Sequence, residues 1–311
     1  MQDPINYREF RCLVSRLDRG AAGSRDRAGD PELEVIDGDA ATALEARGLL
    51  AGGAVTERGR RALDPYRVRR AIILAAGRGI RMHPATRDVP KPMVTVLGEP
   101  IICRALDALE AAGIESVHVV RGYLADSLAP LAERYPGITF INNPAYAETN
   151  NITSLMAARH VLAEGGYVMD SDLVLRRPDL ISPFQYRSNY LGIPMDRAVG
   201  WCFETDGDGR ITGAGVDVRS GVHQIVGVSY WTPEDGSRLA DDLLRVYAMP
   251  GGSQRYWDTV AIQYFPERYD VHVRPCAAED VVELDTFDEL CAFDPSHRVT
   301  CGIAEGGGAE K

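Results

Sequence analysis

The sequence has few cysteines, and none is placed for metal or disulfide chemistry. Six cysteines are scattered over 311 residues without a CxxC pair, a pattern that gives neither a zinc site nor a disulfide framework. The chain does not open with a charged and then apolar leader. It also lacks an apolar run approaching the roughly 20 residues of a membrane span. We therefore expect a cytoplasmic protein with reduced thiols and no membrane partner.

Positive charge is also in short supply. The formal net charge is −11 at pH 7, which argues against a general nucleic-acid binder because phosphate contacts need an excess of Lys and Arg. The hydrophobic share of 45% and charged share of 25% are ordinary for a soluble globular protein. The length allows one large domain and a small appendage. A local basic pocket for a phosphorylated small molecule is compatible with this balance.

Residues 1–66 are expected to form the small appendage. Helical spacing covers Tyr7–Leu17 and Ala40–Arg47, whereas Gly20–Asp39 has few large apolar residues and is expected to be an exposed loop. The order from Ala40 to Leu63 resembles the last helix and wing of a winged helix–turn–helix. Ten Arg stand against twelve Asp or Glu in residues 1–66. This balance favours a winged-helix-like domain used for packing, or for homodimer formation, over DNA binding.

Residues 67–298 alternate strands with helices. Arg70–Leu74 is a short apolar run, typical of a buried parallel strand that enters a glycine turn. The expected elements that follow are a helix over Pro100–Ala112, a strand over Val117–Val120, a helix over Ser127–Tyr135, a strand over Thr139–Asn142, a helix over Asn151–Leu162 and a strand over Gly166–Met169. This alternation predicts an α/β fold with a doubly wound, mostly parallel, Rossmann-like sheet. Hairpin strands follow from Trp201, and residues 299–311 are expected to be a flexible tail.

The most specific segment is the glycine-rich run from Leu74 to Arg81, which is followed by Pro90-Lys91-Pro92. Glycines let backbone N–H groups face a polyphosphate. Arg81 and Lys91 add positive charge where a leaving pyrophosphate builds up negative charge. Met82 stands where a dinucleotide-binding GxGxxG needs its third glycine, and the GK[ST] of a Walker A loop is absent. The candidate nucleotide-binding residues here are Ala75, Ala76, Gly77, Arg78 and Gly79, and the candidate catalytic residues are Arg81 and Lys91.

This run resembles the signature of the nucleotidyltransferases that activate sugar phosphates and small alcohol phosphates, LAAGxGxR followed by PKP. The resemblance covers roughly residues 70–295. It implies that Gly77 and Gly79 cradle a triphosphate while Arg81 and Lys91 bind its charged oxygens. Ile80 replaces the family's usual threonine, which is a mild departure because the backbone matters more. The resemblance implies a nucleotidyltransferase enzyme.

Residues 148–155 read Glu-Thr-Asn-Asn-Ile-Thr-Ser-Leu and resemble the phosphocholine and 2-aminoethylphosphonate cytidylyltransferases. Asn150, Asn151 and Ser154 offer amide and hydroxyl groups that can pair with the cytosine ring. Helix capping is the alternative, but it explains only one of the two asparagines. We therefore expect CTP to be the nucleotide donor.

Acidic residues follow two apolar strand segments. Asp170 and Asp172 come after Tyr167–Met169, where an open α/β sheet places its ligands. By register with the family, Asp172 binds the metal, and Asp170 belongs to the nucleotide site as a neighbouring or ribose-side group. Asp285 lies in a segment that resembles the family's second acidic segment. Two carboxylates suit Mg²⁺, because phosphate oxygens and water complete its octahedron.

Aromatic residues accompany acids in the later part of the chain. The expected acceptor-binding residues are Glu204, Trp231, Tyr256, Trp257 and Asp258. Rings beside an acid suit an ammonium group, although core packing is the alternative for each ring. The expected acceptor is a small phosphonate such as 2-aminoethylphosphonate, or a phosphate monoester such as phosphocholine. Its oxygen is already ionised at neutral pH, so no general base is needed and His83 is expected to be structural.

Two other functions remain open at this point. A sugar-1-phosphate nucleotidyltransferase would share the fold and the metal. A nucleotide-sensing DNA-binding regulator would use the N-terminal domain on DNA and carry an inactive catalytic domain, but the intact Arg81, Lys91 and acidic residues argue against this. The sequence therefore favours transfer of a cytidylyl group from CTP to a small phosphonate, with release of pyrophosphate.

Overall fold

A computed structural model describes residues 4–20, 31–197, 200–216 and 221–300, which belong to two compact units. The first unit comprises residues 1–68 together with 184–186, and the second comprises residues 69–183 and 187–311. Helix α10 (Ser296–Thr300) occupies the start of the expected tail, and the rest of that tail lies outside the described residues. No helix in the described ranges is both long and apolar enough to cross a membrane.

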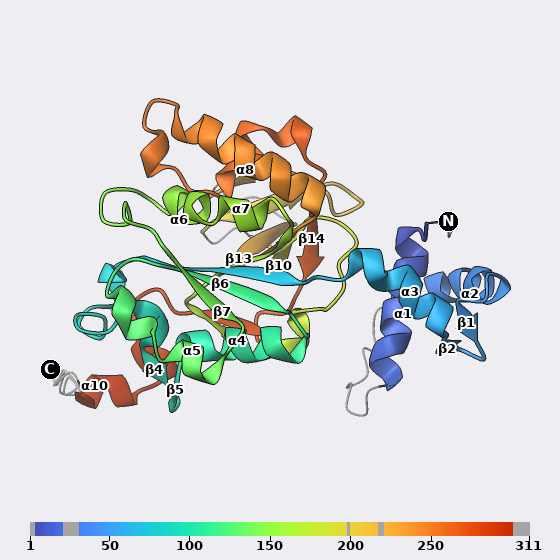
Figure 1. The fold of residues 1–311 in the computed structure, drawn as a ribbon, viewed down its shortest axis with the longest axis horizontal. Coiled ribbons are helices and arrows are strands. Elements are labelled where there is room, and N and C mark those ends of the chain that lie inside the picture. The colour runs from blue at the N-terminus through green and yellow to red at the C-terminus, as the bar shows by residue number, and fades with distance from the viewer. Residues whose placement is uncertain (1–3, 21–30, 198–199, 217–220, 301–311) are drawn as a thin grey trace, which may run out of the picture. The chain divides into compact units, whose positions relative to one another are not determined.

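The first unit contains α1 (Tyr7–Gly20), α2 (Pro31–Ala46), the hairpin of β1 (Leu50–Ala51) and β2 (Ala54–Val55), and α3 (Glu57–Leu63) (Figure 1). The loop expected over residues 20–39 is wrong for residues 31–39, which are helical. Proline is well suited to a first helical turn, where its missing N–H has no partner to lose. Residues 21–30 of that loop lie outside the described residues. The winged-helix assignment stays a prediction.

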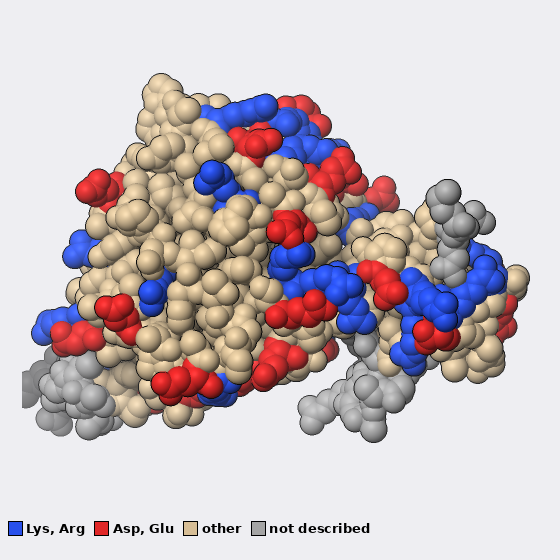
Figure 2. Space-filling view, viewed as in Figure 1, with Lys and Arg blue, Asp and Glu red and all other residues tan. Residues whose placement is uncertain are grey.

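An apolar core holds the first unit together. Leu13, Leu44 and Leu63 are fully buried, and the rings of Tyr66 and Tyr186 stack with their centroids 5.0 Å apart. The aromatic side chains of residues 184–186 therefore complete a core that the first 68 residues begin. Both basic and acidic side chains appear on the visible face of this unit (Figure 2), as the near balance of charges in residues 1–66 predicts.

The second unit is built on a nine-stranded mixed sheet, which confirms the expected α/β class. Its parallel part consists of β3 (Arg70–Ala75), β6 (Ser116–Arg121), β7 (Ile138–Asn142) and β8 (Gly166–Asp170). Antiparallel pairing with β8 adds β13 (Val222–Trp231), and the sheet continues through β11 (Cys202–Thr205), β12 (Ile211–Gly215), β10 (Asn189–Met195) and β14 (His272–Pro275). Helices cover both faces of this sheet (Figure 1).

One face is covered by α6 (Ile152–Ala157), α7 (Arg159–Leu162) and α8 (Pro233–Tyr247), and the other by α4 (Ile101–Ala111) and α5 (Leu131–Arg134) (Figure 1). The helix expected over Ser127–Tyr135 is shortened to α5 after a 3₁₀ turn that ends at Leu128. Pro130 between them explains the break, because proline cannot donate a helical hydrogen bond. The helix expected over Asn151–Leu162 is divided at Ala158 into α6 and α7.

The order of strands in the sheet changes direction at β3. The sheet runs β8-β3-β6-β7, so the chain moves outward from β3 through β6 to β7 and then returns to the other side of β3 as β8. Leu74 is paired with Asp170 across β3 and β8. A crevice forms at the carboxyl ends of strands where such an order reverses. The glycine loop after β3 and the acids after β8 are brought together there.

Candidate active site

The glycine loop leaves β3 at buried Ala75 and Ala76 and is exposed at Gly77 and Arg78. Gly79 has a φ of +60°, a left-handed conformation that favours glycine. A Cβ at Gly79 would also lie 3.0 Å from Lys91 Cβ, whereas nothing lies within 4 Å of the Cβ position at Gly77. The loop therefore brings its backbone close to Lys91 and has open space beside Gly77.

Lys91 joins the acids that follow two different strands. Its Nζ donates to Asp172 Oδ2 at 2.5 Å and to Asp285 Oδ1 at 2.8 Å, and Arg81 Nη2 donates to the same Asp285 oxygen at 2.8 Å. Burial alone lowers the pKa of Lys91, but the two carboxylates outweigh burial and raise it. Lys91 is therefore held as a cation with 12% of its side chain exposed, whereas Arg81 is 70% exposed.

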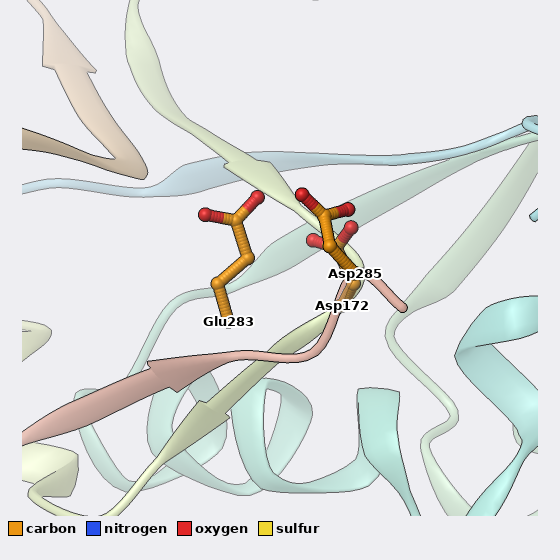
Figure 3. A group of neighbouring side chains, drawn as sticks. All are labelled: Asp172, Glu283 and Asp285. Carbon is orange, nitrogen blue, oxygen red and sulfur yellow. The ribbon is translucent and has the colours of Figure 1, made fainter. Parts of the chain in front are cut away.

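Three carboxylates gather beside Lys91. Asp172, Glu283 and Asp285 each offer an oxygen within 4.8 Å of the others, and the three carboxylates point to the same side (Figure 3). They are positioned by the pairing of β9 (Leu173–Leu175) with β15 (Val281–Glu283). Glu283 is absent from the sequence-based candidates. Its signal is the two-residue spacing from Asp285, because alternate residues of an extended segment face the same way.

The chemistry of this acidic cluster fits a hard divalent cation. Mg²⁺ prefers carboxylate oxygens, and the buried Oδ1 of Asp172 lacks a hydrogen-bond partner within the described part of the chain. Asp285 is fixed from its other side, since its N–H donates to Glu289 Oε2 at 2.8 Å. Glu289 also forms a capping box with Thr286 at the start of α9 (Phe287–Phe293). The acidic segment is therefore anchored by a helix cap.

Close to this cluster lies a second group of polar side chains with buried atoms. Asp170 ends β8 close to Gly227, where any larger side chain would collide with the Asp170 carboxylate. Burial and then the charges of Asp172, Glu283 and Asp258 raise the pKa of Asp170 above its usual range. Burial raises the pKa of Asp258 to about 6. Two acids in one enclosed region favour a cationic partner.

Tyr190 belongs to the same region. Burial and then the charges of Asp258 and Asp170 raise the pKa of Tyr190. Among the described residues neither Tyr190 Oη nor Asp258 Oδ1 has a hydrogen-bond partner, although both atoms are buried. Buried polar atoms in proteins are normally satisfied. These two atoms therefore mark a place where a ligand is expected to supply the missing contacts.

The predicted acceptor residues do not form one box. Trp257 is 5% exposed and stacks on Tyr190 with the ring centroids 6.0 Å apart, and Tyr256 is 49% exposed. Glu204 is half-buried on β11. Trp231 is completely buried and donates from Nε1 to Ser229 Oγ at 3.0 Å. We correct the acceptor set by removing Trp231, because both faces of its strand are covered and its ring packs in the core.

The predicted cytosine readers are bonded within the protein. Ser154 is 6% exposed and its Oγ accepts from Asn143 Nδ2 at 3.1 Å. We therefore remove Ser154 from the nucleotide-binding set, because an enclosed hydroxyl in this network does not face a ligand. Asn151 Oδ1 accepts from the N–H of Trp257 at 3.0 Å, and Asn150 Nδ2 donates to Gln254 O at 3.3 Å. Recognition of cytosine by Asn150 and Asn151 stays a prediction.

Comparison with known proteins identifies the family of the chain. Residues 71–189 match the MobA-like NTP transferase domain. The chain is 38% identical over 226 residues to the 2-aminoethylphosphonate cytidylyltransferase of Lancefieldella rimae. This match covers 72% of this chain and 91% of the relative. It is 29% identical over 221 residues to the choline-phosphate cytidylyltransferase of Streptococcus pneumoniae, and this match covers 71% of this chain and 94% of that relative.

Solved structures give the same result. The CTP:phosphocholine cytidylyltransferase from Streptococcus pneumoniae superposes with a TM-score of 0.68 at 28% identity, covering 74% of this chain and 99% of that one. The inositol-1-phosphate CTP transferase from T. maritima shares the fold with a TM-score of 0.58 at 17% identity, covering 78% and 98%. The chain therefore belongs to the nucleotidyltransferase family that includes the 2-aminoethylphosphonate and phosphocholine cytidylyltransferases, and it is a cytidylyltransferase enzyme.

Proposed function

We propose that this enzyme transfers the cytidylyl group of CTP to 2-aminoethylphosphonate and releases pyrophosphate. The observation that carries the choice of acceptor is the enclosed carboxylate of Asp258, whose Oδ1 lacks a partner among the described residues. Asp170 and Tyr190 lie in the same region, and a protonated amine would supply both charge and N–H donors there. The relative at 38% identity is named for the same acceptor.

The nucleotide side uses the loop and the two cations. The backbone of Gly77–Gly79 faces the triphosphate, with open space beside Gly77 for its oxygens. Lys91 and Arg81 stabilise negative charge on the reacting phosphate and on the leaving pyrophosphate. Asp172, Glu283 and Asp285 would hold Mg²⁺. When bound, the ion neutralises phosphate charge and favours the approach of an anionic acceptor.

The transfer step needs no proton removal. An ionised phosphonate oxygen of the acceptor attacks the α-phosphorus of CTP and forms a new P–O bond. The bond from the α-phosphorus to its bridging oxygen breaks, and pyrophosphate departs with the bonding electron pair. Positioning and charge stabilisation supply most of the catalysis in phosphoryl transfer of this kind.

At the other end of the acceptor, Asp258 receives the ammonium group. A primary ammonium has three N–H donors and can satisfy Asp258 Oδ1 and Tyr190 Oη together. A trimethylammonium group has no N–H donor and is larger, so it would leave these buried oxygens unsatisfied. Desolvated polar groups without partners cost about 1–3 kcal/mol each. The pocket should therefore prefer the primary amine.

Phosphocholine is the second candidate. The ring of Trp257 lies next to Asp258 in the chain and stacks on Tyr190, and aromatic rings attract quaternary ammonium groups. The phosphocholine enzymes among the relatives support this alternative. It would be favoured if the ring face contributes more than the N–H donors that a primary amine offers to the enclosed carboxylate.

The decisive assay is pyrophosphate release with CTP or UTP, crossed with 2-aminoethylphosphonate, phosphocholine and 2-hydroxyethylphosphonate. The highest kcat/KM is expected for CTP with 2-aminoethylphosphonate. Asp258→Asn should reduce kcat/KM for the amine by at least about tenfold, the scale of one charged hydrogen bond, and leave the hydroxyl compound nearly unchanged. Asp241→Asn, which changes an exposed aspartate of α8, is the matched control. A preference of the unaltered enzyme for the hydroxyl compound would exclude the ammonium pocket.

A further inference from the structure

Four hydrogen bonds connect the segment 148–151 to the loop 253–257, more than 100 residues later in the chain. Asn150 N donates to Ser253 O at 2.9 Å, and Asn150 Nδ2 donates to Gln254 O at 3.3 Å. In return, Gln254 Nε2 donates to Glu148 O at 2.8 Å. Trp257 N donates to Asn151 Oδ1 at 3.0 Å. We refer to these four bonds as the tether.

Asn151 departs from the usual behaviour of an asparagine at a helix start. It occupies the N-cap position of α6 but makes no side-chain capping bond. An asparagine in this place normally accepts from a backbone N–H of the first helical turn. Here the side-chain oxygen accepts from a backbone N–H that is 106 residues away. The helix thus forgoes the stabilisation of a cap, and the acceptor oxygen serves the loop instead.

The loop is also fixed at its beginning. Gly252 lies against the end of α8, where a Cβ would collide with the carbonyl oxygens of Val246 and Tyr247. From this root the loop passes exposed Arg255 and Tyr256 before Trp257 and Asp258 turn inward. The Trp257 N–H bond to Asn151 is the tether contact nearest to Asp258. Asp258 is the next residue in the chain, and its buried Oδ1 lacks a hydrogen-bond partner among the described residues.

We infer that Asn151 is a positioning residue for the acceptor pocket, and that Asn150 and Gln254 support it through the rest of the tether. The inference rests on the proposed function for the role of Asp258, but the tether itself is a physical connection that can be measured separately. It predicts that loss of the Asn151 oxygen weakens acceptor binding more than CTP binding. Sequence reasoning alone assigns the same residue to the base.

The geometry gives this role a direct chemical reason. Of the four tether bonds, the one made by the Trp257 N–H lies directly beside Asp258 in the chain, so it bears most directly on the direction of that side chain. If Asn151 cannot accept that bond, the N–H turns to water and the Asp258 carboxylate moves with it. Positioning errors of about 1 Å are enough to impair binding of a small ligand by a large factor. The amine of the acceptor would lose its partner while the phosphonate contacts stay intact.

Two substitutions separate positioning from base recognition. Asn151→Asp keeps an oxygen that accepts from Trp257 N–H but removes the amide donor. Asn151→Leu has a similar size and removes both. If Asn151 positions the loop, KM for 2-aminoethylphosphonate at saturating CTP should rise about fivefold or more in Asn151→Leu, the scale of one lost hydrogen bond. Asn151→Asp should recover most of this loss.

Gln254 offers a test away from the nucleotide. Gln254→Ala removes its bond to Glu148 O and should raise KM for the acceptor about twofold to fivefold, the scale of an exposed hydrogen bond, with KM for CTP unchanged. Gln263→Ala is the matched control, because exposed Gln263 also donates to a distant backbone oxygen, Ala214 O at 3.0 Å. That variant should behave like the unaltered enzyme.

A measurement independent of activity follows the tether directly. Amide hydrogen exchange of a peptide covering residues 252–258 should be about fivefold faster or more in Asn151→Leu, because an N–H without its partner exchanges from an open state. In Asn151→Asp it should match the unaltered protein. Unchanged exchange in Asn151→Leu overturns the inference. So does a rise of KM for CTP in both Asn151 variants while KM for the acceptor is constant, which would assign Asn151 to the base. If the unaltered enzyme does not use the amine, the proposed function fails, and hydrogen exchange still decides the tether.

Discussion

Replacing Lys91 by methionine should have opposite effects on stability and on metal binding. Lys91 is one of two lysines in the chain, the other being the last residue, Lys311. It bridges Asp172 and Asp285 at 2.5 and 2.8 Å with only 12% of its side chain exposed. Methionine has a similar length and no charge, so the variant leaves two carboxylates and Glu283 facing one another. Breaking one partner of a largely buried ion pair costs about 3 kcal/mol.

The size of the effect can be compared with a surface pair. A loss of about 3 kcal/mol lowers Tm by roughly 6–12 °C for a domain of this size. Arg134 also bridges two carboxylates, those of Glu99 and Asp107, at 2.7 and 3.0 Å, but it is 49% exposed. Exposed pairs contribute about 1 kcal/mol or less. Arg134→Met is therefore the matched control and should lower Tm by no more than about 4 °C.

Adding Mg²⁺ should close most of the difference in Tm between Lys91→Met and the unaltered protein. In the unaltered protein the ion must compete with Lys91 for the same oxygens, whereas in Lys91→Met the carboxylates are free to bind it. A ligand at about 100 times its Kd stabilises the folded protein by about 2.7 kcal/mol. The assay measures Tm from thermal unfolding followed by circular dichroism, once without Mg²⁺ and once with Mg²⁺ in the millimolar range. Equal Tm values for the variant and the unaltered protein, together with equal responses to Mg²⁺, would refute this account of Lys91.

Three further outcomes are expected. The ratio of kcat/KM for the amine over the hydroxyl acceptor should fall about tenfold from pH 7 to pH 5, as Asp258 with its pKa of about 6 is protonated; a flat ratio in the unaltered enzyme would contradict this, and Asp258→Asn should remove the dependence. Gly79→Ala should lower kcat at least about tenfold, because the new Cβ would lie 3.0 Å from Lys91 Cβ on a left-handed backbone; unchanged kinetics would show that the loop tolerates the side chain. Asp172→Asn and Asp285→Asn should each remove Mg²⁺-dependent turnover with an unchanged circular dichroism spectrum, and full activity in EDTA would contradict the metal mechanism.

Local sequence patterns are enough to predict where a candidate site residue lies when its position has a local cause. A strand that ends in a glycine turn has to place its backbone at the carboxyl edge of the sheet, and Gly77 and Gly79 follow β3 at this edge. Asp172 and Asp285 each follow an apolar strand segment, and the structure brings their carboxylates together. Those residues converge because β8 returns beside β3, as expected for a doubly wound sheet.

Long-range contacts could not be obtained in this way. The partners of Lys91 lie 81 and 194 residues further along the chain, and the partner of Asn151 lies 106 residues further. The position of Trp257 depends on how Gly252 packs against the end of α8, and no local sequence pattern encodes this contact. The assignment of Trp231 to the acceptor site is instead wrong. An aromatic residue in a strand that is covered on both faces packs in the core and does not contact a ligand.

Residues 184–186 affect how the N-terminal unit can be exchanged or lost. The chain leaves the catalytic unit after Pro183, contributes three residues to the other unit and resumes the catalytic unit at Arg187. A recombination event with one breakpoint at the end of the first 68 residues would therefore separate Tyr66 from the ring of Tyr186 that stacks on it. A chimaera that receives the first 68 residues must also receive residues 184–186. Inheritance of the appendage is thus tied to the sequence of the enzyme that carries it.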